Sequence, residues 1–169
     1  GIEKGLALIE EAKTKLAFKD ELATIEAAFR YNYILAITDE GNYTQAFELL
    51  LDYQKAKLLN PKDYQRLLSY VINKKALAQA QKGFYPEAMQ TLAEGLKLLP
   101  QEKTLQDNLA ALATNYLNKL IAEKNFSQAF AFLKDKLAEE YLSSGLKSDL
   151  LTYYYQRQTE FLVGEGQIS

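Results

Sequence analysis

The sequence predicts an all-α fold built from antiparallel helical hairpins, and three observations support this. Apolar residues recur at steps of three and four, as at Leu109, Leu112 and Tyr116, which is typical of one face of an α-helix. Residues that interrupt helices are few, with 3 Pro and 8 Gly in 169 residues, and several of them separate the apolar stretches. A short motif also occurs three times along the chain.

The positions of turn-forming residues divide the chain into helices. Asn60, Pro61 and Asp63 form a helix start, with an N-cap residue, Pro at the first helical position and an acid in the first turn. Gly41, Gly83 and Gly145 each follow a helical stretch, where glycine suits the left-handed turn that ends a helix. We therefore expect helices at 2–16, 20–39, 44–58, 62–82, 86–98, 102–123, 127–142 and 147–162.

The repeated motif occupies residues 41–47, 83–89 and 124–130. Its first and third copies, Gly-Asn-Tyr-Thr-Gln-Ala-Phe and Lys-Asn-Phe-Ser-Gln-Ala-Phe, share four of seven residues. The alanines at positions 46, 88 and 129 are 42 and 41 residues apart. Each copy opens the second helix of a predicted hairpin, so the chain is expected to repeat one hairpin three times.

The middle copy resembles the tetratricopeptide repeat (TPR) family. The resemblance rests on residues that match the family's pattern of small, aromatic and closing positions: Ala76, Gly83, Tyr85, Ala88, Leu92, Gly95 and Pro100. It implies that the hairpins stack as a short right-handed superhelix, an α-solenoid. The outer copies depart from the pattern, because Ile34 and Leu117 stand at the position of Ala76. The period of about 42 residues also exceeds the family's usual 34.

On this reading, residues 1–169 form a single TPR-like domain. The three repeats span 20–60, 61–100 and 101–142, and a capping helix covers the last repeat at 146–163. Residues 1–19 have two open interpretations, a plain N-terminal helix or the second half of an earlier repeat.

Composition limits the chemistry that we expect. The chain has no His and no Cys, so the commonest general base, the thiol nucleophile and the usual transition-metal ligands are missing. Its net charge is −2, without the basic surplus of nucleic-acid binders. No apolar run reaches the length of a membrane span. We therefore expect no enzyme activity, no cofactor, no metal, no nucleic-acid partner and no membrane span.

The first residue is Gly rather than Met, so the sequence predicts no compartment: cytoplasmic, periplasmic and membrane-anchored placements stay open.

The resemblance implies that first helices line a concave face that holds a peptide or helix of a partner protein. The expected contact residues combine asparagines able to bond a peptide backbone with tyrosines, which are frequent at interfaces: Tyr31, Asn32, Tyr70, Asn73, Lys74, Gln81, Asn115 and Asn118. The expected function is a non-catalytic interaction scaffold. Two alternatives stay open, a peptide-sensing domain of a larger bacterial regulator and a scaffold that self-associates. Three consecutive tyrosines at 153–155 cannot share one helix face, so at least one is expected to be exposed.

Overall fold

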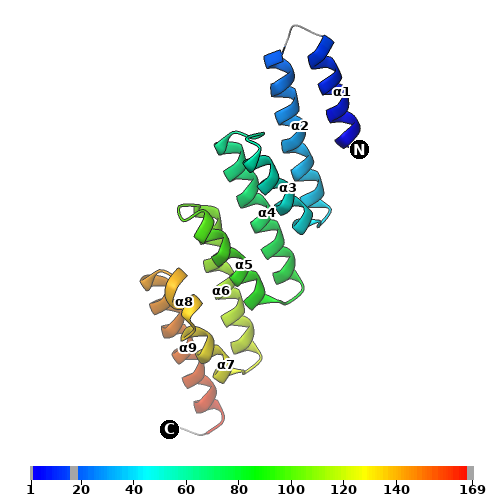
Figure 1. The fold of residues 1–169 in the computed structure, drawn as a ribbon. Helices are drawn as coiled ribbons and strands as arrows, with labels where there is room; N and C mark the ends of the chain where they lie inside the picture. Colours follow the sequence, from blue (N-terminus) through cyan, green and yellow to red (C-terminus); the bar gives the residue numbers. More distant parts are fainter. Residues whose placement is uncertain (1, 16–18, 167–169) are drawn as a thin grey trace. The chain divides into compact units, whose positions relative to one another are not determined.

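The computed structural model describes residues 2–15 and 19–166, and in this part of the chain every regular element is an α-helix. The expected all-α class is confirmed (Figure 1). The helices are α1 (Ile2–Lys15), α2 (Lys19–Asp39), α3 (Tyr43–Lys55), α4 (Pro61–Gln81), α5 (Tyr85–Leu98), α6 (Lys103–Ala122), α7 (Phe126–Leu133), α8 (Lys136–Tyr141) and α9 (Ser144–Gly164).

The chain divides into two compact units, a first unit (Gly1–Lys75) and a second unit (Ala76–Ser169). Helix α4 contributes its residues 61–75 to the first unit and 76–81 to the second. The two units are described separately below.

In the first unit, α2 packs against α1 on one side and against α3 on the other, and consecutive helices run in opposite directions (Figure 1). The core is aliphatic, with Ile34, Leu50, Leu67 and Val71 fully buried. Helix α1 has no buried side chain. It approaches α2 at Gly5, where an added Cβ would lie 2.5 Å from the ring of Phe29, so a larger residue at this position would require the Phe29 ring to move.

In the second unit, α6 is the central helix, and α5, α7 and α9 all pack against it. Leu105, Leu109 and Leu117 of α6 have at most 1% of their surface exposed. Helix α9 also packs on α7 through aromatic side chains, with the rings of Phe126 and Phe161 5.2 Å apart. This helix therefore covers apolar surface of both α6 and α7.

The three copies of the motif form the same turn. In each, a residue with positive φ precedes the N-cap: Gly41 at 86°, Gly83 at 87° and Lys124 at 58°. Helices α3, α5 and α7 then begin at equivalent residues, two positions later. The N-cap amide bonds the carbonyl oxygen five residues before it in every copy, as Asn42 N to Ile37 O (2.9 Å), Phe84 N to Gln79 O (3.0 Å) and Asn125 N to Leu120 O (2.8 Å). The sequence repeat is thus a structural repeat of the turn.

The buried positions repeat in the same register. Ala46, Ala88 and Ala129 have no exposed surface. The residues twelve positions before them and four positions after them are equally buried: Ile34, Ala76 and Leu117, then Leu50, Leu92 and Leu133. In each copy, therefore, the alanine and the residues twelve positions before it and four positions after it are all buried.

Two expected helices have other bounds in the structure. The predicted helix 44–58 ends at Lys55, because Lys57 takes φ of 53° and Leu58 N bonds Tyr53 O, a left-handed closure without glycine. The predicted helix 127–142 is two helices, α7 and α8, separated at 134–135, where Asp135 is a residue type that favours helix starts.

Gly145 was predicted to end a helix, and this prediction was wrong. It lies in the first turn of α9. The side chain of Ser143 caps that turn by accepting a hydrogen bond from Leu146 N at 3.2 Å. The predicted end of the first helix, at residue 16, lies outside the described residues.

Candidate functional site

The eight residues predicted to contact a partner are all at least partly accessible. Tyr31, Tyr70, Asn73 and Lys74 are half-buried in the first unit, where Asn32 is exposed. Gln81, Asn115 and Asn118 are exposed in the second unit.

Two of these residues meet in one polar cluster, which also includes Asp39 at the end of α2. The hydroxyl of Tyr70 donates a hydrogen bond to Asp39 Oδ1 at 2.6 Å. Lys74, one turn further along α4, places Nζ 2.7 Å from the same oxygen and 5.2 Å from the centroid of the Tyr70 ring. The polar ends of Tyr70 and Lys74 are therefore bound to Asp39.

The three members of this cluster shift one another's pKa. Hydrogen bonds from Lys74 and then Tyr70 lower the pKa of Asp39 below its ordinary value. The hydrogen bond to Asp39 raises the pKa of Lys74 and also, ahead of burial, that of Tyr70. At neutral pH the cluster is an aspartate, an ammonium group and a neutral phenol. Such a set links α2 to α4 and offers no group that is ready to transfer a proton.

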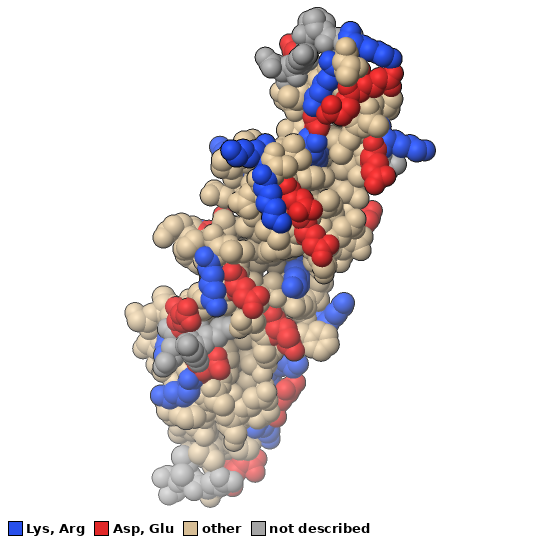
Figure 2. Space-filling view, viewed as in Figure 1, with Lys and Arg blue, Asp and Glu red and all other residues tan. Residues whose placement is uncertain are grey.

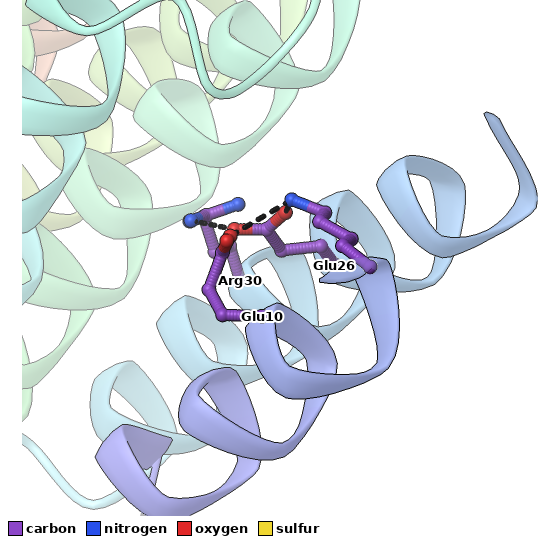
Figure 3. Close-up of polar contacts among 4 residues, drawn as sticks. Glu10, Glu26 and Arg30 are labelled. Atoms are coloured by element: carbon purple, nitrogen blue, oxygen red, sulfur yellow. Dashed lines mark hydrogen bonds and ion pairs between the residues drawn. The ribbon is translucent and has the colours of Figure 1, made fainter. Parts of the chain in front are cut away.

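A second charged cluster, the Glu26 network, joins α1 to α2 (Figure 3). The carboxylate of Glu26 accepts hydrogen bonds from both Lys13 and Arg30, while Lys13 also bonds Glu10 at 2.9 Å. Glu26 and Arg30 are 6% and 9% exposed, respectively, and the Arg30 guanidinium lies 5.7 Å from the centroid of the Tyr53 ring.

Burial by itself raises the pKa of Glu26. The hydrogen bonds from Lys13 and Arg30 together lower it by more, so the net shift of the pKa is downward. The pKa of Lys13 is raised, chiefly by its hydrogen bond to Glu26. The network is a buried carboxylate paired with two cations. Through Lys13 this network bonds α1, which has no buried side chain, to α2.

The second unit has a groove of about 720 Å³ between α5 and α7. Both helices pack on α6, and Tyr116 of α6 lies in the groove with its ring largely buried. The lining residues come from the end of α4, from α5, α6 and α7, and from the residues that follow α7: Gln79, Pro86, Glu87, Met89, Gln90, Thr91, Tyr116, Gln128, Ala131, Phe132 and Asp135.

The floor of this groove is apolar and aromatic. Met89 is 2% exposed, and the rings of Tyr116 and Phe132 meet edge to face with centroids 5.2 Å apart. Tyr85 stacks on Tyr116 at 5.5 Å and an interplanar angle of 20°. Stacked and edge-to-face rings hold one another in place, so the floor is pre-formed.

The polar side chains of the groove are held by hydrogen bonds, two of them across hairpins and one within α5. Thr91 donates to Gln79 Oε1 at 2.8 Å, and Gln128 Nε2 donates to the Tyr116 hydroxyl at 3.1 Å. Gln90 Nε2 donates to Glu94 at 3.0 Å. In the described part of the chain, these bonds leave the Gln79 amide nitrogen and the Gln90 carbonyl oxygen available to a ligand.

The sequence analysis did not identify this groove. It selected residues of first helices, whereas most of the lining comes from second helices. One signal was present: Gln45, Glu87 and Gln128 each precede the buried alanine of a motif copy, and all three are exposed. Because this position is polar in all three copies, it indicates that one face of each second helix lies outside the core.

Other kinds of site find little support. Within residues 2–15 and 19–166, no three acidic side chains come together as a metal ion would require. No helix in those ranges has the length and apolar character needed to cross a bilayer. On the face shown in Figure 2, Lys and Arg are interspersed with Asp and Glu, and neither sign forms a continuous patch.

Of the tyrosines at 153–155, Tyr154 is buried and Tyr155 is 52% exposed, which confirms that they do not share one buried face.

Comparison of the chain with protein-family models, with curated proteins and with solved structures found no match.

Proposed function

We propose that this chain is a non-catalytic protein-interaction module that holds a short segment of a partner protein in the groove between α5 and α7. The groove itself is the observation that carries the proposal. Its volume of about 720 Å³ falls in the range of ligand sites, which combine apolar walls with a few placed polar groups. Here the aromatic floor supplies the apolar contact, and the amides of Gln79 and Gln90 supply the polar groups.

The repeated turn supports a tetratricopeptide-like arrangement for the whole chain. The three turns share their backbone hydrogen bonds, and each copy buries the same alanine position. In repeat proteins such units bury their apolar faces against neighbouring units. We propose a single domain with repeats at 20–60, 61–100 and 101–142, stacked as a short right-handed superhelix.

Three carboxylates have a pKa shifted away from that of a general acid. Glu26, Asp39 and Glu160 have a pKa below the ordinary value because hydrogen bonds to neighbouring side chains stabilise the carboxylate. A carboxyl group that acts as a general acid near neutral pH needs a raised pKa instead. These three carboxylates therefore have structural roles in this proposal.

The predicted concave-face residues offer a different location for the same function. Asn115 and Asn118 are exposed on α6, and the resemblance to the TPR family assigns them to the peptide-binding face. Two alanines distinguish the locations, because Ala131 lines the groove and Ala111 lies on α6 outside it. Both are exposed helical residues of the second unit.

The test is selection of binding peptides from a random twelve-residue display library on the immobilised 169-residue chain, followed by titration of a selected peptide. Ala131→Trp fills the groove and should abolish binding, whereas Ala111→Trp should leave the affinity unchanged. The reverse result would move the site to the predicted concave face. Failure to select any peptide, or binding that neither variant changes, would contradict the proposed function.

A further inference from the structure

The charged residues that line the groove all have the same sign. Glu87 and Asp135 are part of the lining, and no Lys or Arg is among the eleven described residues that form it. Lys119 lies nearby with Nζ 5.6 Å from the centroid of the Tyr85 ring, outside the lining. The described lining of the groove thus includes two carboxylates and no cation.

Glu87 is one of the two carboxylates that line the groove. It is exposed in the first turn of α5, next to Pro86, and no ion pair engages it in the described part of the chain. Asp135 makes a further interaction of its own, so Glu87 is the lining carboxylate that can pair with a cation of a ligand.

The charge of Glu87 contributes to a shift in the pKa of the buried Tyr116 phenol. The pKa of Tyr116 is raised above its ordinary value, first by burial and then by the carboxylates of Glu87 and Glu123. A negative potential at the groove favours a positively charged ligand and repels an acidic one.

We propose that the groove receives a partner segment in which an apolar side chain contacts Met89 and Phe132 and an adjacent Lys or Arg pairs with Glu87. This inference rests on the proposed function and names the class of partner. The charge supplies the preference among segments, because paired rim charges act mainly on selectivity and association rate. The apolar floor supplies the buried contact area.

The free amide groups fit the backbone of such a segment. Gln90 Oε1 can accept a hydrogen bond from a peptide N–H, and Gln79 Nε2 can donate one to a peptide carbonyl. The other half of each amide is already bonded within the protein, which restricts the side-chain rotamers before the segment arrives. Binding therefore needs little further ordering of these two side chains.

The experiment compares the peptides that the twelve-residue library yields on three proteins: the wild-type chain, Glu87→Lys and Asp107→Lys. The control residue, Asp107, is exposed on α6 and outside the groove lining, and its substitution changes the net charge by the same amount. Selection on the wild type should enrich Lys and Arg beside an apolar residue. Selection on Glu87→Lys should lose that enrichment, whereas selection on Asp107→Lys should keep it.

Titration of one selected peptide makes the test quantitative. Glu87→Gln should weaken its binding by about twofold to fivefold, the effect of removing one exposed ion pair. The difference should shrink as salt is raised from about 0.01 M to about 1 M, because the Debye length then falls from about 30 Å to about 3 Å.

Two outcomes would overturn the inference. One is groove-dependent peptides without Lys or Arg enrichment, and the other is enrichment that persists on Glu87→Lys. In both cases Ala131→Trp would still abolish binding, so the proposed function would survive. Peptides that bind Ala131→Trp as well as the wild type would instead refute the groove itself.

Discussion

The side-chain amide of Gln128 donates a hydrogen bond of 3.1 Å to the hydroxyl of Tyr116, twelve residues earlier in the chain. Thr91 and Gln79 bond across the preceding hairpin with the same separation, at 2.8 Å. The buried pair Ala76 and Ala88 has this spacing too. The turn geometry of the repeat therefore fixes which residues meet across a hairpin, and it brings both polar pairs to the groove.

The buried alanines should tolerate no larger side chain. Ala88 has no exposed surface, so Ala88→Leu should lower the free energy of unfolding by about 1–3 kcal/mol, as overpacking does in other cores. Urea unfolding measures this change. The exposed Ala111 on α6 provides the control, and Ala111→Leu should change the free energy by less than about 0.5 kcal/mol. Equal effects of the two variants would contradict the assigned packing.

The turns before the second helices should depend on backbone conformation. Gly83 has φ of 87°, and an added Cβ would meet only Lys119 Nζ, at an ordinary contact distance of 4.0 Å, so Gly83→Ala should cost about 1–2 kcal/mol because of the left-handed backbone alone. Gly145 lies in α9, where an added Cβ would have no neighbour within 4 Å, so Gly145→Ala should act in the opposite direction and gain about 0.5–1 kcal/mol. Thermal unfolding of the two variants checks the signs.

Lys57 has a left-handed backbone without being glycine, so replacing it with glycine should have the opposite effect to Gly83→Ala. Its φ is 53° where helix α3 closes, so Lys57→Gly should relieve strain and gain up to about 1 kcal/mol. A loss of stability in calorimetry would show that the side chain of Lys57 contributes more than its backbone strain costs.

Much of the fold was predictable because its signals are local. The turns at Gly41 and Gly83 follow from glycine and from the motif around it, and the predicted starts of α3, α5 and α7 lie within one residue of those observed. The break after α7 was not predictable, because no Gly or Pro stands at 134–135. Gly145 was wrongly predicted to end a helix, because glycine is also tolerated in the first turn of a helix, here one capped by Ser143.

The candidate site was less predictable because it depends on side-by-side placement of distant segments. The groove brings Glu87 of α5 near Phe132 of α7, 45 residues later, and no local pattern encodes that distance. The resemblance to a family directed attention to first helices instead. There, Tyr70 and Lys74 turned out to be bonded to Asp39, which precedes Tyr70 by 31 residues in the sequence.

The Glu26 network should make stability depend on acid. The pKa of Glu26 is lower in the folded chain than its ordinary value of 4.5, so its contribution is present above pH 4.5 and is lost as the pH falls through the lowered pKa. The raised pKa of Lys13 acts only in alkali, where that contribution is lost as the pH rises through the raised value. Urea unfolding at neutral pH and below pH 4 should show the acid loss.

The variant Glu26→Gln isolates this contribution. At neutral pH it should lose about 3 kcal/mol, because Arg30 is left buried without its carboxylate, and it should lose less on acidification than the wild type does. Glu11→Gln is the control, since Glu11 pairs with Lys15 at an exposed site, and its acid profile should match the wild type. A wild-type acid profile in Glu26→Gln would contradict the assignment.

The Asp39 cluster predicts a change in tyrosine titration. The hydrogen bond to Asp39 raises the pKa of Tyr70 above its ordinary value of 10.0, so Asp39→Asn should move that pKa downward. Titration of the Tyr70 ring carbon signal by NMR measures it. Asp63→Asn, on the same helix and 3.9 Å from Arg66, should leave the Tyr70 titration unchanged. An unchanged pKa in Asp39→Asn would show that the bond does not form in solution.

Backbone amide NMR of the chain with one library-selected peptide shows whether the groove between α5 and α7 holds a partner segment. Peptide addition should shift the amide signals of Thr91, Gln128, Ala131 and Phe132 and leave those of Asn115 and Asn118 in place. Shifts confined to Asn115 and Asn118 would contradict this prediction and would place the partner on the face that the sequence predicted.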